Sequence, residues 1–80
     1  MEPIPKFKVQ VSDDDSLEGI RFNLILVKVY DTRTNHFLTI PVEKSVFDFV
    51  TRYRIKSAIR SAKSVLEIIA YESGLDYNGK

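Results

Sequence analysis

The stretch that decides the fold reads IRFNLILVKVYD, residues 20–31. Its apolar side chains alternate along the chain, which is the period of a β-strand. One face would carry Ile20, Phe22, Leu24 and Leu26, and the other Ile25, Val27 and Val29. Two structures fit a strand that is apolar on both faces: a central strand covered on both sides, or a strand with a bulge near Leu26 that changes the inward face.

Two shorter strands are predicted on either side of this stretch. Phe7, Val9 and Val11 alternate with polar residues, whereas the polar cluster 13–19 is typical of a surface loop. The polar segment 31–35 predicts a hairpin loop before a third strand at 36–42. Pro41 cannot donate a backbone hydrogen bond, so the third strand should lie at an edge or end there.

The chain from residue 44 to about residue 72 contains neither glycine nor proline, and its apolar spacing predicts a helix. Ser45 is the expected N-cap, and Gly74 the expected terminator. The helix carries two apolar stripes that point in roughly opposite directions. A bend or break near Arg52–Ile55 would reconcile them.

These elements predict one α+β domain over residues 1–80. A three-stranded, mainly antiparallel meander should be followed by one long or kinked C-terminal helix packed on the sheet. The expected divisions are an extended arm at 1–5, the sheet at 6–42, the helical region at 44–72 and a flexible tail at 75–80.

Composition excludes several classes of protein. The 80 residues include no cysteine, so disulfide frameworks, thiolate nucleophiles and cysteine-ligated zinc are impossible. The longest near-apolar run, residues 24–27, is far shorter than the roughly 20 residues of a membrane span. No export signal is visible at the start of the sequence, and the default expectation is therefore the cytoplasm.

No motif points to catalysis. Asp13, Asp14 and Asp15 lack the spacing of a calcium-binding loop, and His36 is the only histidine. The three glycines are too far apart for a phosphate-binding loop. We therefore expect no enzyme activity, metal or cofactor.

An apolar surplus favours a protein interface instead. Several apolar residues have no place in a core made from one sheet face and one helix. The expected interface, on the second sheet face and an exposed strand edge, consists of Ile25, Val27, Val29, Phe37 and Tyr53. A non-enzymatic interaction module of the accessory-subunit or inhibitor type, self-associating as a homodimer or binding another protein, is the first functional hypothesis.

A basic helical stripe supports the alternative, nucleic-acid binding. Between residues 44 and 63 six basic residues accompany a single acid, Asp48, although the whole chain has a net charge of only +1. Helical spacing places four of the basic residues on one side: Arg52, Lys56, Arg60 and Lys63. Such a stripe could contact phosphates, or it could be the solvated rim of a buried face.

Overall fold

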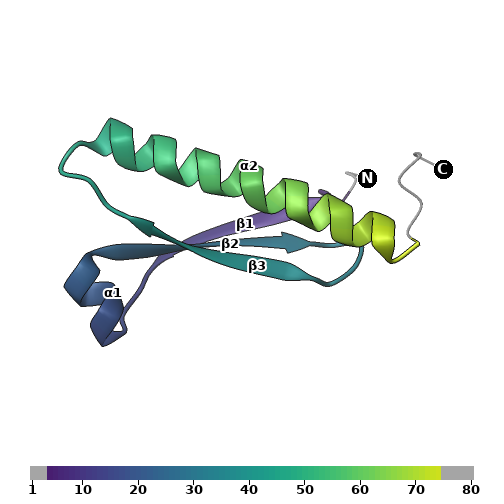
Figure 1. Ribbon diagram of the computed structural model, residues 1–80, viewed down its shortest axis with the longest axis horizontal. Coiled ribbons are helices and arrows are strands. Elements are labelled where there is room, and N and C mark those ends of the chain that lie inside the picture. Colours follow the sequence, from purple (N-terminus) through teal and green to yellow (C-terminus); the bar gives the residue numbers. More distant parts are fainter. Residues whose placement is uncertain (1–3, 75–80) are drawn as a thin grey trace.

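The computed structural model describes residues 4–74, and the predicted tail at 75–80 lies outside them, as does most of the predicted arm. Figure 1 shows a three-stranded antiparallel sheet covered on one face by a long C-terminal helix. This confirms the predicted α+β fold. Along the chain lie β1 (Phe7–Asp13), α1 (Leu17–Phe22), β2 (Leu24–Asp31), β3 (Phe37–Glu43) and α2 (Asp48–Glu72).

The sheet has a regular register with β2 at its centre. Val11 lies opposite Val27 on β2, and Val27 lies opposite Ile40 on β3. The pairing continues without a shift from end to end, so β2 contains no bulge. It is the central strand of the sheet, as the first of the two predicted alternatives requires. Since directly opposite residues share a face, the odd-numbered residues of β1 and β2 face α2, together with the even-numbered residues of β3.

The core lies between α2 and the β2–β3 pair. Val27, Val29 and Val42 from the sheet meet a stripe of small and apolar helix residues, Ala58, Ala62 and Leu66. The alanines let the helix approach the sheet closely. Burial of a valine or leucine side chain contributes roughly 1.5–3 kcal/mol.

The predicted interface is wrong for Ile25, Val27 and Val29. All three are buried on the sheet face that carries α2, with Val27 and Val29 entirely inaccessible. The even-numbered residues of β2 point to the opposite face instead. Both faces of β2 are apolar, so alternation alone could not tell which of them the helix covers.

The predicted start of the second strand at Ile20 is also wrong: residues 17–22 form the short helix α1, and the strand begins at Leu24. Ser16 caps it, its hydroxyl accepting a hydrogen bond from the Gly19 backbone N–H at 3.0 Å. Asn23 ends it in the left-handed region, at φ 55°. Only Gly19 is buried in this helix, and a Cβ there would come within 2.3 Å of the Asp14 carbonyl oxygen.

Helix α2 begins later than predicted and continues without a break. It starts at Asp48, and Ser45 accepts a hydrogen bond from the Phe47 N–H just ahead of it rather than capping it. The second apolar stripe is not packed by a bend: Phe49 and Tyr53 are exposed. The helix ends at Glu72, and Gly74 follows with φ +76°, which confirms the predicted terminator.

A network of charged side chains ties one end of the molecule together. Arg33, in the β2–β3 loop, donates hydrogen bonds to the buried Asp31 at 3.0 and 3.1 Å and to Glu67 of α2 at 2.7 Å. Lys6 lies just ahead of β1, and its ammonium is 3.1 Å from the Glu67 carboxylate. The network therefore joins the first strand, the hairpin and the helix.

Candidate functional site

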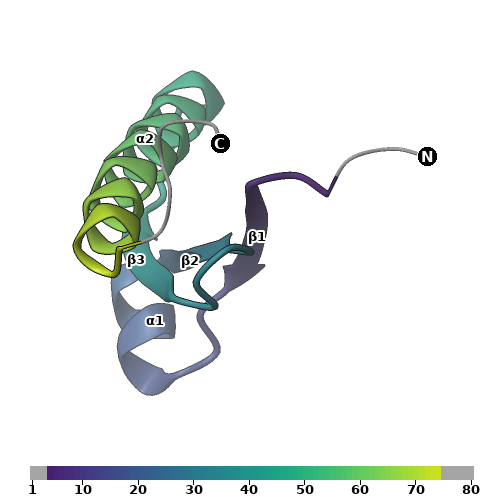
Figure 2. The same cartoon turned by 90° about the vertical axis from the view of Figure 1, so that its right-hand side faces the viewer.

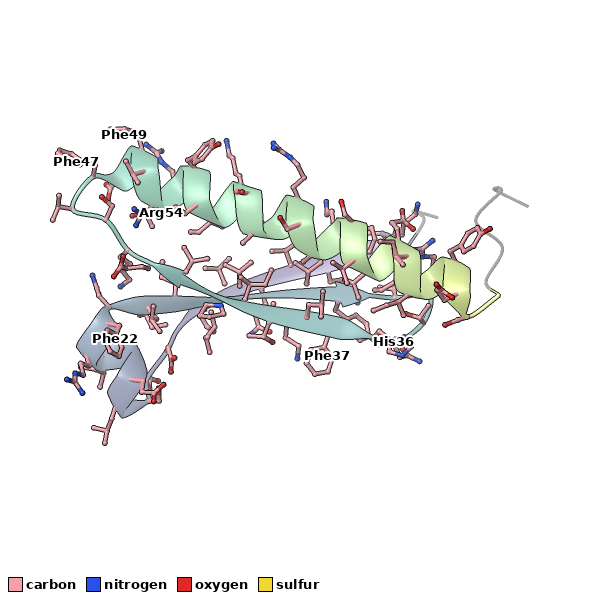
Figure 3. The ribbon with its side chains drawn as sticks, viewed as in Figure 1. Phe22, His36, Phe37, Phe47, Phe49 and Arg54 are labelled. Atoms are coloured by element: carbon pink, nitrogen blue, oxygen red, sulfur yellow. The ribbon has the colours of Figure 1, made fainter. Side chains whose placement is uncertain are left out.

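The two predicted interface residues that remain on the surface lie far apart in the fold. Phe37 is 52% exposed on the sheet face opposite α2, where the Lys28 ammonium lies 4.4 Å from the centre of its ring. Tyr53 is 72% exposed on α2. Figure 3 shows Phe37 below the sheet, on the side away from the helix. The predicted set therefore does not form one surface.

A different surface emerges along β1, whose outer edge is unpaired in the part of the chain that the structure describes. At either end of β1, Lys6 accepts a backbone hydrogen bond from Thr32, and Asp14 donates one to Leu24. In an antiparallel pair the residues bonded to the neighbour alternate, so Lys8, Gln10 and Ser12 also point their backbone groups toward β2. The outward backbone groups belong to Phe7, Val9, Val11 and Asp13.

The same strand carries apolar side chains that the helix leaves uncovered. Val9 and Val11 lie directly opposite Val29 and Val27 and share their face. Yet Val9 and Val11 are 42% and 48% exposed, whereas their partners are fully buried. Figure 2 shows the cause: α2 lies over β2 and β3, and β1 stands clear of it. The result is an apolar ledge beside the helix, formed by Val9 and Val11.

The wall above this ledge is basic. Lys56, Arg60 and Lys63 of α2 line a hollow of about 310 Å³ together with Ile59. The Lys63 ammonium lies 5.7 Å from the centre of the Phe7 ring on β1, which places this flank of α2 on the β1 side. Helical periodicity places Arg52 on the same flank. The structure thus brings the predicted basic stripe next to an open strand, a neighbour that the sequence alone did not indicate.

The opposite edge of the sheet differs in its chemistry. The residues on either side of Pro41 in β3 form the backbone hydrogen bonds to β2, so the backbone of Pro41 faces outward. Pro41 has no N–H to offer there. Proline at such a position blocks the addition of another strand. Beside it lies a second hollow, of about 340 Å³, whose lining includes Tyr53 and Arg54. Of the two sheet edges, only β1 has a residue sequence that leaves it open.

Two of the acidic residues weighed for chemistry, Asp13 and Asp14, have structural contacts. Asp14 accepts a hydrogen bond from the Ser16 N–H at 3.0 Å, and hydrogen bonds from the side chain and backbone of Ser16 hold the pKa of Asp14 below its usual value. Asp13 lies 3.3 Å from the ammonium of Lys44. His36 is exposed in the β2–β3 loop, at the other end of the sheet (Figure 3). Among residues 4–74, no three histidine or acidic side chains come together as a metal site.

Two further apolar groups are exposed at the end of the molecule that carries α1. The rings of Phe47 and Phe49, at the start of α2, lie 5.6 Å apart with no cover from the sheet (Figure 3). Leu17 and Ile20 are exposed on α1. Leu17 and Ile20 lie in α1 and Phe49 lies in α2, so these groups do not form part of a strand edge.

Comparisons with known proteins add no relative. No family model matches the chain, and neither curated proteins nor solved structures gave a significant match. Within the described residues, no helix combines the length and the apolar character that crossing a bilayer requires.

Proposed function

We propose that the chain is a non-enzymatic interaction module that binds an extended protein segment along the free edge of β1. The observation that carries the proposal is the coincidence of unpaired backbone groups with the exposed ledge of Val9 and Val11. Strand addition draws affinity from main-chain hydrogen bonds and specificity from alternate side chains. An accessory subunit or inhibitor, acting in the cytoplasm, belongs to the same proposal.

The chemistry of the surface defines the segment that fits it. An added strand would direct every second side chain onto the ledge, so these side chains should be apolar. The side chains between them would point to the opposite face of the sheet, where Lys8 of β1 is exposed and favours carboxylates. The preferred partner segment therefore combines alternating apolar residues with acidic ones and lacks proline.

A peptide titration tests this proposal. The probe is the acetylated and amidated heptapeptide Glu-Val-Glu-Val-Glu-Val-Glu, titrated into the labelled full chain. Val9→Pro removes an outward N–H that does not bond to β2, and we expect it to weaken binding at least roughly tenfold, equivalent to about 1.4 kcal/mol. Gln10→Ala, on the opposite face of β1, is the matched control and should leave affinity unchanged. Equal affinity in Val9→Pro would contradict the proposal.

The alternative, nucleic-acid binding, is favoured by one observation, the basic flank of α2. Lys56, Arg60 and Lys63 are exposed and adjacent, and phosphate contacts of this kind give affinity that falls steeply with salt. Replacing Arg52, Lys56 and Arg60 by alanine should then weaken binding of a single-stranded or duplex oligonucleotide and flatten its salt dependence. Oligonucleotide affinity that these replacements leave intact would eliminate this alternative.

A further inference from the structure

The edge of β1 is complementary to itself, and we infer that its partner is a second copy of this chain, paired antiparallel about Gln10. This inference rests on the proposed function and names the partner of the same edge. The two copies would form one continuous six-stranded sheet with both α2 helices on the same face, since paired strands share their faces.

The charge pattern of β1 favours this antiparallel pairing. The strand and its flanks read KFKVQVSDDD over residues 6–15, basic at the start and acidic at the end. Pairing about Gln10 places Lys6 opposite Asp14 of the other copy, and Lys8 opposite Ser12 with Asp14 on the diagonal. Opposite charges at such cross-strand positions are stabilising, whereas a parallel arrangement would align like charges.

The backbone and the apolar side chains fit the same register. The outward-facing pairs become Phe7 with Asp13 and Val9 with Val11, each twice, which allows about eight hydrogen bonds between the copies. The valines of the two ledges meet as one apolar patch of four side chains. Asp13 of the second copy would approach Phe7, whose ring already has the cations of Arg33 and Lys63 within 6 Å.

Proline restricts the register. Pro5 lies just outside β1 and has no N–H, so a shift that pairs residue 13 with residue 5 would lose bonding there. The register about Gln10 is the one that pairs the whole of Phe7–Asp13 with itself. The edge of β3, which contains Pro41, offers no comparable self-pairing.

Repulsion between the two helices is small enough to permit the pairing. Strands lie about 4.8 Å apart and α2 lies over β2 and β3, so the two helix axes would be separated by about 19 Å. Helices with side chains are about 10 Å across, which leaves roughly 9 Å between the two basic flanks. That separation is close to the screening length of about 8 Å at physiological ionic strength.

Single cysteines provide the test, because the natural chain contains none. In the proposed pairing, Gln10 of one chain lies directly opposite Gln10 of the other, with their Cα atoms about 4.5 Å apart. Two cysteines at that distance can form a disulfide. Lys8 and Ser12 lie on the same exposed face as Gln10. Lys8 of one chain would be about 14 Å from Lys8 of the other, and likewise for Ser12, but Lys8 of one chain would lie next to Ser12 of the other. The variants are Gln10→Cys, Lys8→Cys and Ser12→Cys in the full chain, oxidised with glutathione disulfide after circular dichroism confirms folding.

We expect Gln10→Cys to form the disulfide dimer at least roughly tenfold faster than Lys8→Cys or Ser12→Cys alone, because only its thiols are held within bonding range. A mixture of Lys8→Cys and Ser12→Cys should yield the mixed dimer at a rate close to that of Gln10→Cys. Equal rates of disulfide formation for the three single variants would overturn the pairing, and so would a mixture of Lys8→Cys and Ser12→Cys that forms no mixed dimer.

Light scattering of the unmodified chain gives an independent readout. Its mass should rise toward twice 9.2 kDa with concentration, and Val9→Pro should lower it. A monomer at every concentration up to about 0.5 mM would refute self-pairing. Binding of the Glu-Val heptapeptide by that monomer would still support the proposed function, so the two failures are distinguishable.

Discussion

Replacing Val27 by alanine should cost far more stability than the same replacement at Val11, although the two residues face each other across the same pair of strands. Val27 has no exposed surface, and removing two methylene equivalents loses about 1.6 kcal/mol of transfer free energy. A cavity that does not collapse adds about 1 kcal/mol. The expected loss for Val27→Ala is therefore about 2.5 kcal/mol.

Val11 is 48% exposed beside the helix and leaves no enclosed cavity, so Val11→Ala should cost less than about 1 kcal/mol. An 80-residue domain has roughly 8 kcal/mol of stability in total, so the Val27 variant remains folded. With an m-value of about 1.2 kcal/mol/M, its urea midpoint should fall by about 2 M.

The assay is urea unfolding followed by circular dichroism, at the lowest protein concentration that gives a signal. Association would protect Val11 but would not change the burial of Val27, so dilution isolates the effect of the helix. If both variants lower the urea midpoint equally under these conditions, α2 does not bury β2 more than β1, and the reasoning is refuted. A shift below about 0.5 M for Val27→Ala would likewise refute the packing described here.

Three further predictions concern the rest of the fold. Burial opposes ionisation of Asp31, but hydrogen bonds from Arg33 prevail and hold its pKa below the ordinary 3.8, and Arg33 lowers the pKa of Glu67 below 4.5. The stability that the two carboxylates contribute is therefore complete above pH 4.5 and is lost as the pH falls through their lowered pKa values. The melting temperature should decline below about pH 4, and a melting temperature that stays constant down to pH 2 would contradict this. Asp31→Asn should cost about 3 kcal/mol in a thermal melt at pH 7, because it leaves Arg33 partly unpaired, and a loss below about 0.5 kcal/mol would show that the network is dispensable. Gly19→Ala should destabilise the chain by about 1–3 kcal/mol even though alanine favours helices, because its Cβ would clash with Asp14, and a gain in stability would show that the loop yields.

The fold was accessible from the sequence where a single periodicity dominated. β1 alternates cleanly between valine and polar residues, and Gly74 marks the end of a long uninterrupted helix, so both were predicted close to their observed limits. Helix α1 was missed because Gly19, an unfavourable helix residue, lies in its middle. The signals that could have found it are Ser16 as N-cap and Asn23 as a left-handed terminator.

The candidate site could be predicted only in part. The sequence indicated a basic helical flank and an open strand edge, but it assigned the interface to Ile25, Val27 and Val29. Leu24 and Leu26 make the other face of β2 apolar as well, and the local sequence pattern does not show which face packs against the alanines of α2. The offset of the helix from β1, which exposes Val9 and Val11, results from packing between elements distant in sequence.

The charged network has a consequence for the order in which the chain folds. Arg33 and Asp31 are two residues apart and can meet as soon as the hairpin closes, whereas Glu67 joins Arg33 across 34 residues and Lys6 across 61. Long loops close late because their entropy is lost before their contacts form. We therefore expect the β2–β3 hairpin to be structured in the transition state, and Glu67→Gln to accelerate unfolding while leaving the folding rate nearly unchanged.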